Sequence, residues 1–423
     1  MLKSAYKPPG EPGLWHDFLA QLERTLAHVN AHPATVEYLT HPRRTVALTV
    51  PVQLDDGTVS FFSGYRVVHN IALGPARGGV RYHPRVSLGQ SVGLAAIATI
   101  QSAVFRLPYG GAAGGVSVNP RKLSLGEVER LTRRYAAELV DVIGPDKDIL
   151  GPDLGTGERE MAWMMDTFST NRGFTEPGVV TGKPPQLGGV SKRGEAVGRG
   201  VLYAVEAFTR FQEQDLAGST VAVQGYGKVG RAVARLFSEA GAKVIAVSDE
   251  WGAVYNPDGL DYKALLAHFK ETGRVEGFAG AHTIGRDALV GLNADFLILA
   301  ALEGLINEGN VDQVRAKVIV ESAVGAVTAD ADAELRRRGV PVVPDVIAGG
   351  GGLTMDYLEW VQNFSMFNWS EDRVWSAMQR RVAQTLEEVC TYAEAHAIDL
   401  RLASYAIAVD QINFSTHMRG VYP

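Results

Sequence analysis

Apolar residues recur every three or four positions from Trp15 to about Asn30. This spacing places them on one face and predicts an amphipathic helix. Farther along, Thr45–Leu54 and Thr58–Val68 are rich in β-branched residues and flank the pair Asp56-Gly57. An Asp-Gly pair between two such runs is typical of a β-hairpin. The first part of the chain is therefore predicted to combine a helix with a pair of strands.

Three longer helices are predicted outside the middle of the chain. Ser87 is placed to cap a helix that runs through the alanine-rich stretch Val92–Phe105. A second helix is predicted for Ser124–Ile143, where Gly144-Pro145 ends the pattern. The third is an amphipathic helix over Glu371–Ala395.

The middle of the chain alternates short apolar runs with helical patterns. Gly198–Gln212 is predicted to be a helix, and Thr220–Gln224 a short buried strand. This order is typical of a parallel sheet covered by helices. Later strands of the same sheet are predicted at Phe296–Ala300, Val318–Glu321 and Val342–Val346.

A glycine motif follows the first of these strands. Gly225, Gly227 and Gly230 are spaced as GxGxxG, ahead of a predicted helix Val229–Ala240 and a strand Lys243–Val247. This context indicates a dinucleotide-binding turn, in which the backbone approaches a pyrophosphate and the helix N-terminus stabilises its charge. Asp249 stands at the end of the second strand and is a candidate to bind a hydroxyl of the adenosine ribose, which would favour NAD over NADP. It is equally suited to be a solvated turn residue.

Leu107–Val116 is a second glycine-rich stretch. Its four glycines surround Ala112 and Ala113. Glycine is required where φ is positive or where a ligand lies against bare backbone. The sequence therefore predicts a tight loop here, either as a ligand site or as a turn between core segments.

Composition narrows the class of protein. The chain has 423 residues, 46% of them hydrophobic, a formal net charge of −6 and one cysteine, Cys390. Together with the alternation of strands and helices, these values predict an α/β protein of two domains. The single cysteine indicates no disulfide framework and no thiolate metal site, and the charge gives no electrostatic case for nucleic acid; no metal is expected. No run is long and apolar enough to suggest a membrane span or a signal peptide, so a cytoplasmic location is expected.

Two glycine- and proline-rich segments suggest where the domains meet. Thr181–Pro185 with Gly188-Gly189 breaks both periodicities, and Gly349–Gly352 is predicted to be a hinge ahead of a helix from Thr354. We therefore expect one domain from residues 1–185 with 352–423, for substrate and oligomer contacts. The other, residues 186–351, is expected to be of Rossmann type.

Several motifs resemble those of the glutamate/leucine/phenylalanine/valine dehydrogenases, and of the glutamate dehydrogenase branch in particular. Gly74–Pro84 is similar to the family's G-P-x-K-G-G-x-R-[YF]-H-P, and Gly151–Thr156 to its P-D-x-[GN]-T. Leu107–Val116 is similar to P-Y-G-G-[GA]-K-G-G, and Tyr357–Asn363 to the family's final segment. The resemblance implies interconversion of glutamate with 2-oxoglutarate and ammonia by NAD or NADP.

The chain departs from this family at the substrate contacts. Ala113 stands at the catalytic lysine, and Gln101 at the lysine that meets the main-chain carboxylate. Arg77 replaces the lysine for the side-chain carboxylate, and Asp356 replaces a serine for the same group. Gly349 stands at an asparagine before the hinge glycines, whereas the proton-transfer acid is retained as Asp153.

Two further departures concern the nicotinamide end of the cofactor. Val197 replaces a threonine and Val324 an asparagine, so two hydrogen-bonding groups are lost. The loss of two lysines and the gain of Asp356 are expected to make the net charge of the pocket about three units more negative. Two unit charges in close contact interact by ~4 kcal/mol at an effective dielectric near 20. A dicarboxylate should then bind poorly.

The resemblance leaves three hypotheses. The first is a regulatory subunit, inactive alone, that assembles into hexamers with a catalytic glutamate dehydrogenase paralogue and responds to an amino acid such as leucine. The second is an amino-acid dehydrogenase whose altered pocket accepts a cationic or neutral substrate. The third is a metabolite sensor that acts alone or on an unrelated partner.

Overall fold

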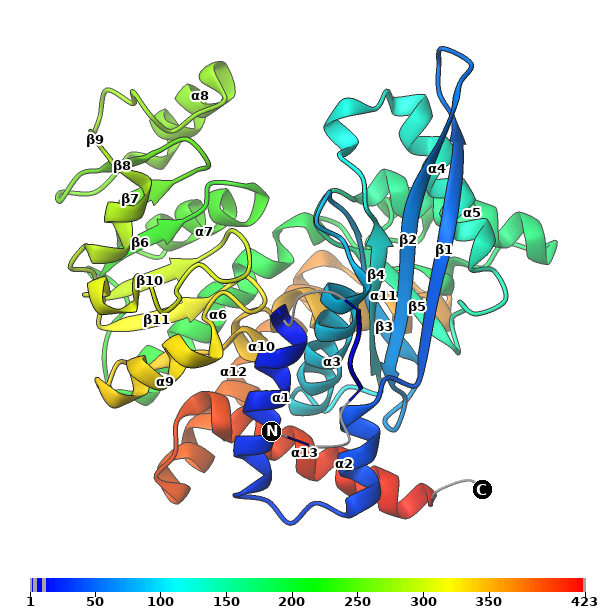
Figure 1. Cartoon of the computed structure of the whole chain (residues 1–423). Helices are drawn as coiled ribbons and strands as arrows, with labels where there is room; N and C mark the ends of the chain where they lie inside the picture. Colours follow the sequence, from blue (N-terminus) through cyan, green and yellow to red (C-terminus); the bar gives the residue numbers. More distant parts are fainter. Residues whose placement is uncertain (1, 3–5, 10–12, 421–423) are drawn as a thin grey trace. The chain divides into compact units, whose positions relative to one another are not determined.

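The computed structural model describes residues 2, 6–9 and 13–420. The chain forms two compact units (Figure 1). Unit 1 comprises Met1–Arg193, Leu353–Trp375 and Tyr405–Pro423, and unit 2 comprises Gly194–Gly352 and Ser376–Ser404. The expectation that all of 352–423 belongs to the first domain is therefore wrong for Ser376–Ser404.

Unit 1 is built on a five-stranded sheet in the order β1-β2-β4-β3-β5. Strands β1 and β2 pair antiparallel as the predicted hairpin, with Gly57 at φ +86° in its turn. Strands β3, β4 and β5 run parallel. The strand bounds are β1 Arg44–Gln53, β2 Val59–Asn70, β3 Ala76–Tyr82, β4 Gly110–Val116 and β5 Asp148–Pro152.

Helices cover both faces of this sheet (Figure 1). Helix α3 packs on β2 and β4, and helices α4 and α5 pack on the other face around a core that includes Tyr82, Leu131 and Met164. Ser124 caps α4, with Glu127 completing a capping box. The helices of unit 1 are α1 Gly13–Leu26, α2 Pro33–Thr40, α3 Leu88–Val104, α4 Leu125–Glu138 and α5 Glu158–Arg172.

The glycine-rich stretch after Leu107 is a strand and not the predicted loop. Strand β4 is buried along its whole length between β2 and β3. Its glycines are required by close packing, because a Cβ on Gly110 would lie 1.9 Å from the carbonyl oxygen of Asn70. A Cβ on Gly111 would lie 2.2 Å from Oγ1 of Thr99 on α3.

Unit 2 contains a seven-stranded sheet in the order β12-β11-β10-β6-β7-β8-β9. The strands from β12 to β7 pair parallel, as predicted, and β8 and β9 add antiparallel at one edge. The strand bounds are β6 Thr220–Gln224, β7 Lys243–Ser248, β8 Ala253–Tyr255, β9 His282–Ile284, β10 Phe296–Leu299, β11 Val318–Glu321 and β12 Val342–Val343.

The remaining helices lie wholly or partly in unit 2. Helices α11, α12 and α13 each cross from one unit to the other. None of the helices in the described ranges is long and apolar enough to cross a membrane. The bounds are α6 Ala196–Phe211, α7 Lys228–Glu239, α8 Tyr262–Thr272, α9 Ala329–Arg337, α10 Asp345–Ala348, α11 Gly350–Ser365, α12 Glu371–His396 and α13 Leu400–Arg419.

Gly350–Gly352 of the predicted hinge lie in helix α11, and only Gly349 is a turn residue between two helices. Gly349 ends α10, and α11 begins at Gly350 rather than at Thr354. A Cβ on Gly351 would lie 2.4 Å from the carbonyl oxygen of Ala196, and 2.6 Å from the Cα of Gly200. These glycines therefore let α11 and α6 approach closely.

Lys183 and Glu359 form an ion pair at the centre of unit 1. Both side chains are fully buried, and Lys183 Nζ lies 2.7 Å from Glu359 Oε1. The same carboxylate accepts hydrogen bonds from the backbone N–H groups of Gly182 and Val190. This one side chain of α11 thus fixes the segment that precedes unit 2.

We expect Lys183→Met to lower the free energy of unfolding by about 3–5 kcal/mol, because it leaves a buried carboxylate uncompensated. Adding Glu359→Gln should recover part of the loss. Lys192→Met is the matched control, since Lys192 pairs with Glu371 at the surface and such pairs contribute about 0–1 kcal/mol. Urea unfolding of all three variants measures the difference, and equal losses at Lys183 and Lys192 would contradict the prediction.

Candidate active site and dinucleotide cradle

Neighbouring strands of unit 1 bring three of the predicted site residues together. Arg77 lies on β3, Ala113 on β4, and Asp153 directly after β5. Strand β3 pairs with both of the others, and a Cβ on Gly79 would lie 2.7 Å from the Cβ of Asp153. The parallel pairing thus places Asp153 and Ala113 on either side of β3.

Ala113 places no reactive group in this site. Its side chain is 5% exposed, and its backbone pairs with Val67 of β2. A methyl group can neither transfer a proton nor stabilise developing charge. The backbone that would present a lysine is in place, but the side chain is absent.

Asp356 projects from α11 and is fully buried. Arg77 donates to one of its carboxylate oxygens. Arg193 donates through Nε to Oδ1 at 2.8 Å, and through a terminal nitrogen to Oδ2 at 3.0 Å. Burial lowers the pKa of both arginines, that of Arg77 to about 9. Guanidinium groups stay charged in proteins at neutral pH.

This cluster corrects the expected charge of the pocket. Asp356 does not add a free negative charge, because two guanidinium groups share its carboxylate. The three side chains together carry one net positive charge. The sequence analysis did not predict Arg193, which lies between the predicted boundary segment, ending at Gly189, and the predicted helix from Gly198.

Asp153 is held by an arginine that the sequence analysis also passed over. Arg81 of β3 approaches its two carboxylate oxygens at 3.2 and 3.3 Å. The backbone N–H of Leu154 donates to Asp153 Oδ1 at 2.6 Å. The Asp153 side chain is 30% exposed. It is thus oriented and still reachable by solvent.

The other predicted substrate and cofactor positions are distributed over both units. Gln101 is half-buried on α3, whose Thr99 packs against β4. In unit 2, Val197 lies in the first turn of α6 and Val324 in the segment after β11, both half-buried. The side chain of valine can neither donate nor accept a hydrogen bond at either position.

The predicted glycine turn of unit 2 has the geometry of a phosphate cradle. Gly225 has φ +106°, and a Cβ on Gly230 would lie 1.8 Å from the carbonyl oxygen of Gly225. A Cβ on Gly227 would meet nothing within 4 Å, and no side chain caps α7. The open backbone at a helix N-terminus fits a pyrophosphate.

Two buried polar atoms lie at the carboxyl edge of the same sheet. Gln224 is the last residue of β6, and Ser322 directly follows β11. The side-chain atoms Gln224 Oε1 and Ser322 Oγ have no hydrogen-bond partner among the described residues. Ligands of parallel α/β sheets bind at this edge. The residues present therefore fit a dinucleotide, whose nicotinamide supplies hydride transfer when it is bound.

Asp249 is already engaged by the backbone. Its Oδ1 accepts from the N–H groups of Trp251 and Gly252 at 2.8 and 3.0 Å, and its Oδ2 from that of Val275 at 2.7 Å. These contacts support the turn alternative for Asp249. Contact with a ribose stays a prediction.

Comparison with known proteins identifies the family. The model for the glutamate/leucine/phenylalanine/valine dehydrogenases matches residues 188–420, and the model for their dimerisation domain matches residues 42–170. The chain belongs to the glutamate/leucine/phenylalanine/valine dehydrogenases.

Individual members are similar over almost the whole chain. A glutamate dehydrogenase of Thermotoga maritima is 44% identical over 98% of this chain and 100% of its own length. Glutamate dehydrogenase B of Halobacterium salinarum is 42% identical over 95% of this chain and 94% of its own length. The crystal structure of a hetero-hexameric glutamate dehydrogenase from Thermus thermophilus, in a leucine-bound form, has 48% identity and a TM-score of 0.96. It covers 99% of this chain and 100% of that one.

Unit 2 of this family member also holds a buried ionic network around Arg401. Arg401 donates to Glu321 at 2.6 Å, to Asp332 at 2.9 Å and to Asp345 at 3.4 Å. Glu321 accepts from the N–H of Val327, and Asp345 from that of Gly325. The network fixes the segment that carries Val324, and it explains why Ser376–Ser404 packs in unit 2.

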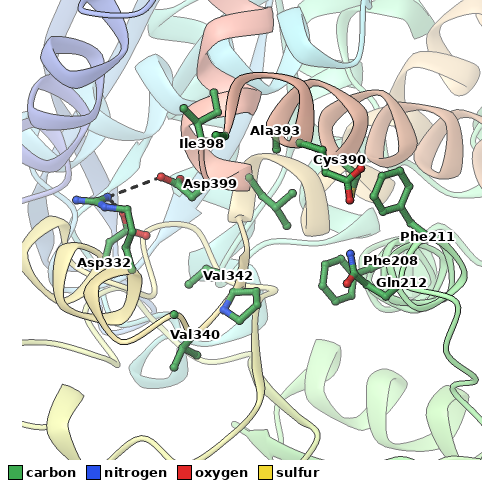
Figure 2. Close-up of a pocket in the computed structure, with 16 residues that line it drawn as sticks. Phe208, Phe211, Gln212, Asp332, Val340, Val342, Cys390, Ala393, Ile398 and Asp399 are labelled. Carbon is green, nitrogen blue, oxygen red and sulfur yellow. Dashed lines mark hydrogen bonds and ion pairs between the residues drawn. The ribbon is translucent and has the colours of Figure 1, made fainter.

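A separate cavity of about 400 Å³ lies in unit 2 (Figure 2). The ends of α6 and α12 contribute Phe208, Phe211 and Cys390, and Arg336 pairs with Asp399 at 3.8 Å on its wall. None of the predicted site residues lines it. The cavity is thus distinct from the glycine cradle.

Burial raises the pKa of Glu321 to about 7, against the attraction of Arg401. The folded state then binds more protons than the unfolded state between about pH 4.5 and 7. We therefore expect the free energy of unfolding to fall, by roughly 2–3 kcal/mol, as the pH rises through this window.

Glu321→Gln should remove this dependence, so its stability relative to the unmodified chain should increase from pH 5 to pH 8. Urea unfolding at several pH values measures the effect. Glu334→Gln is the control, because the pKa of Glu334 is lowered rather than raised, and it should follow the unmodified chain across the window. Parallel pH curves for Glu321→Gln and the unmodified chain would show that Glu321 does not titrate there.

Proposed function

We propose that this chain is a glutamate dehydrogenase homologue that is inactive alone and serves as a regulatory subunit in a hetero-oligomeric glutamate dehydrogenase. The observation that carries the proposal is Ala113, a buried methyl group at the family's catalytic lysine. General acid/base catalysis contributes roughly 10²–10⁴-fold, and loss of charge stabilisation adds to this. Asp153 alone does not replace both contributions.

The arrangement of Asp356 argues against a dehydrogenase for a cationic amino acid. Such a substrate would need a free carboxylate in the pocket. Asp356 is already bound by Arg77 and Arg193, and the cluster carries a net positive charge that would repel a second cation. The altered-substrate hypothesis is therefore weaker than it was from the sequence.

Assembly with a paralogue is supported by analogy. The similar Thermus thermophilus structure is a hetero-hexamer in a leucine-bound form. A chain that retains the family fold needs little new surface to join similar subunits in a symmetric ring. We propose an amino-acid effector, with leucine as the first compound to test. Action as a sensor without a paralogue is the alternative.

The cofactor proposal follows from the two valines. The glycine cradle of unit 2 is intact, and relatives from Halobacterium salinarum include NAD- and NADP-specific enzymes. Val197 and Val324 remove hydrogen bonds only at the nicotinamide end. We propose that this chain binds NAD or NADP mainly through the adenosine and pyrophosphate.

The purified chain alone should show no glutamate oxidation and no 2-oxoglutarate amination above background with NAD or NADP. The reason is that Ala113 and Gln101 stand where the family has active-site lysines. Turnover of even a hundredth of ~10 s⁻¹, a common enzyme rate, from a preparation free of paralogue would refute the proposal. Mixed with a paralogue that has the lysine, the chain should co-elute and change its kinetics. A sensor that acts alone would do neither.

NAD and ADP-ribose should bind with similar affinity in calorimetry, because the nicotinamide makes few specific contacts. Val197→Thr with Val324→Asn should shift the preference toward NAD. Gly230→Ala, which would place a methyl group against the Gly225 carbonyl, should abolish the binding of NAD and of ADP-ribose. A preference of the unmodified chain for NAD of tenfold or more would show that its nicotinamide pocket still functions.

A further inference from the structure

We propose that Asp356 is an internal ligand: its carboxylate fills a carboxylate-binding site formed by Arg77 and Arg193, and thereby keeps free carboxylates out. The inference rests on the proposed function for the identity of the pocket. The class of ligand excluded is an organic carboxylate such as the side-chain end of a dicarboxylate.

The contacts are those of a bound carboxylate. Arg193 meets both oxygens of Asp356 in the two-pronged geometry that guanidinium groups use for carboxylates, and Arg77 adds a third donor. The donors come from β3 and from the end of the segment that precedes unit 2, while the carboxylate comes from α11. Three distant parts of the chain thus converge on one negative group.

A structural ion pair in the same unit has a different composition. Arg66 pairs with Asp148 through Nε and a terminal nitrogen, and the carbonyls of Gly78 and Gly79 accept its other bonds. One cation thus meets one anion, and the side chains of Arg66 and Asp148 are each 1% exposed. This pair is fully satisfied and closed to solvent.

The Asp356 cluster is neither balanced nor fully satisfied. Two cations meet one anion, and Arg77 Nε is buried without a hydrogen-bond partner among the described residues. Tyr109 Oη is also buried without a hydrogen-bond partner among the described residues. Unused donors beside a bound carboxylate are expected where a site has capacity for another ligand.

The arginines remain reachable from solvent. Arg77 and Arg193 side chains are each 11% exposed, although Asp356 itself is fully buried. Once the carboxylate of Asp356 is removed, a small anion can therefore approach the guanidinium groups. A serine at this position would leave both the space and the positive charge.

The test is binding of carboxylates to Asp356→Ser, measured by calorimetry with glutarate and acetate. We expect glutarate to bind at least tenfold more tightly than to the unmodified chain, and to raise the melting temperature of the variant only. Asp356→Asn removes the same charge but keeps the volume, so it should gain no comparable binding. In Asp356→Ser, the additional change Arg77→Met should abolish the gain.

Asp148→Ser is the matched control, because it also deprives a buried arginine of its carboxylate but at a closed pair. It should lose stability and gain no carboxylate binding. Equal gains at Asp148 and Asp356, or no gain in a folded Asp356→Ser, would overturn the proposal. If Asp356→Ser does not fold alone, refolding in glutarate decides: recovery supports an internal ligand, and failure refutes it. These outcomes are independent of whether the unmodified chain turns over glutamate.

Discussion

Buried charges in this protein are held by opposite charges from distant parts of the chain, and the positions of its functional residues depend on this pairing. Transfer of an isolated charge into a protein interior costs several kcal/mol, so a buried ion persists only with well-placed partners. Glu359 holds Lys183, Asp356 holds Arg77 and Arg193, and Arg401 holds three carboxylates. Each set fixes a segment that borders a substrate or cofactor position.

Close backbone packing is the second constraint, and it explains how the fold accommodates Ala113. Strand β4 is held by its glycines, which β2, β3 and α3 require to be bare. Nothing in that packing requires a lysine at Ala113. A small apolar residue avoids the cost of desolvating an ammonium group, so loss of chemistry does not imply loss of stability.

The two units differ in how much of the family's function their residues support. In unit 2 the glycine cradle, the carboxyl edge of the sheet and the Arg401 network are all in place. In unit 1 the chemical groups are lost or occupied, since Ala113 is inert and Asp356 binds two arginines. This asymmetry supports the proposal of a subunit that binds a nucleotide but is inactive alone.

The sequence by itself determined the local structure and the family. Periodicity and caps predicted the β1–β2 hairpin, helices α3 and α4 and the parallel sheet of unit 2, because these depend on neighbouring residues. The motifs predict that Ala113 stands at the family's catalytic lysine, because flanking glycines and prolines fix its position in the motif. Here the relevant information lies within a few residues of each feature.

Only the tertiary structure decided which distant segments and side chains are in contact. Glycine-rich Gly110–Val116 was predicted as a loop and is a buried strand. Gly349–Gly352 was predicted as a hinge, whereas Gly350–Gly352 belong to helix α11. Both stretches serve contacts with distant backbone. The expected charge of the pocket had to be corrected for the same reason. Asp356 is 279 residues from Arg77 and 163 from Arg193, and no local pattern records that three such side chains will meet.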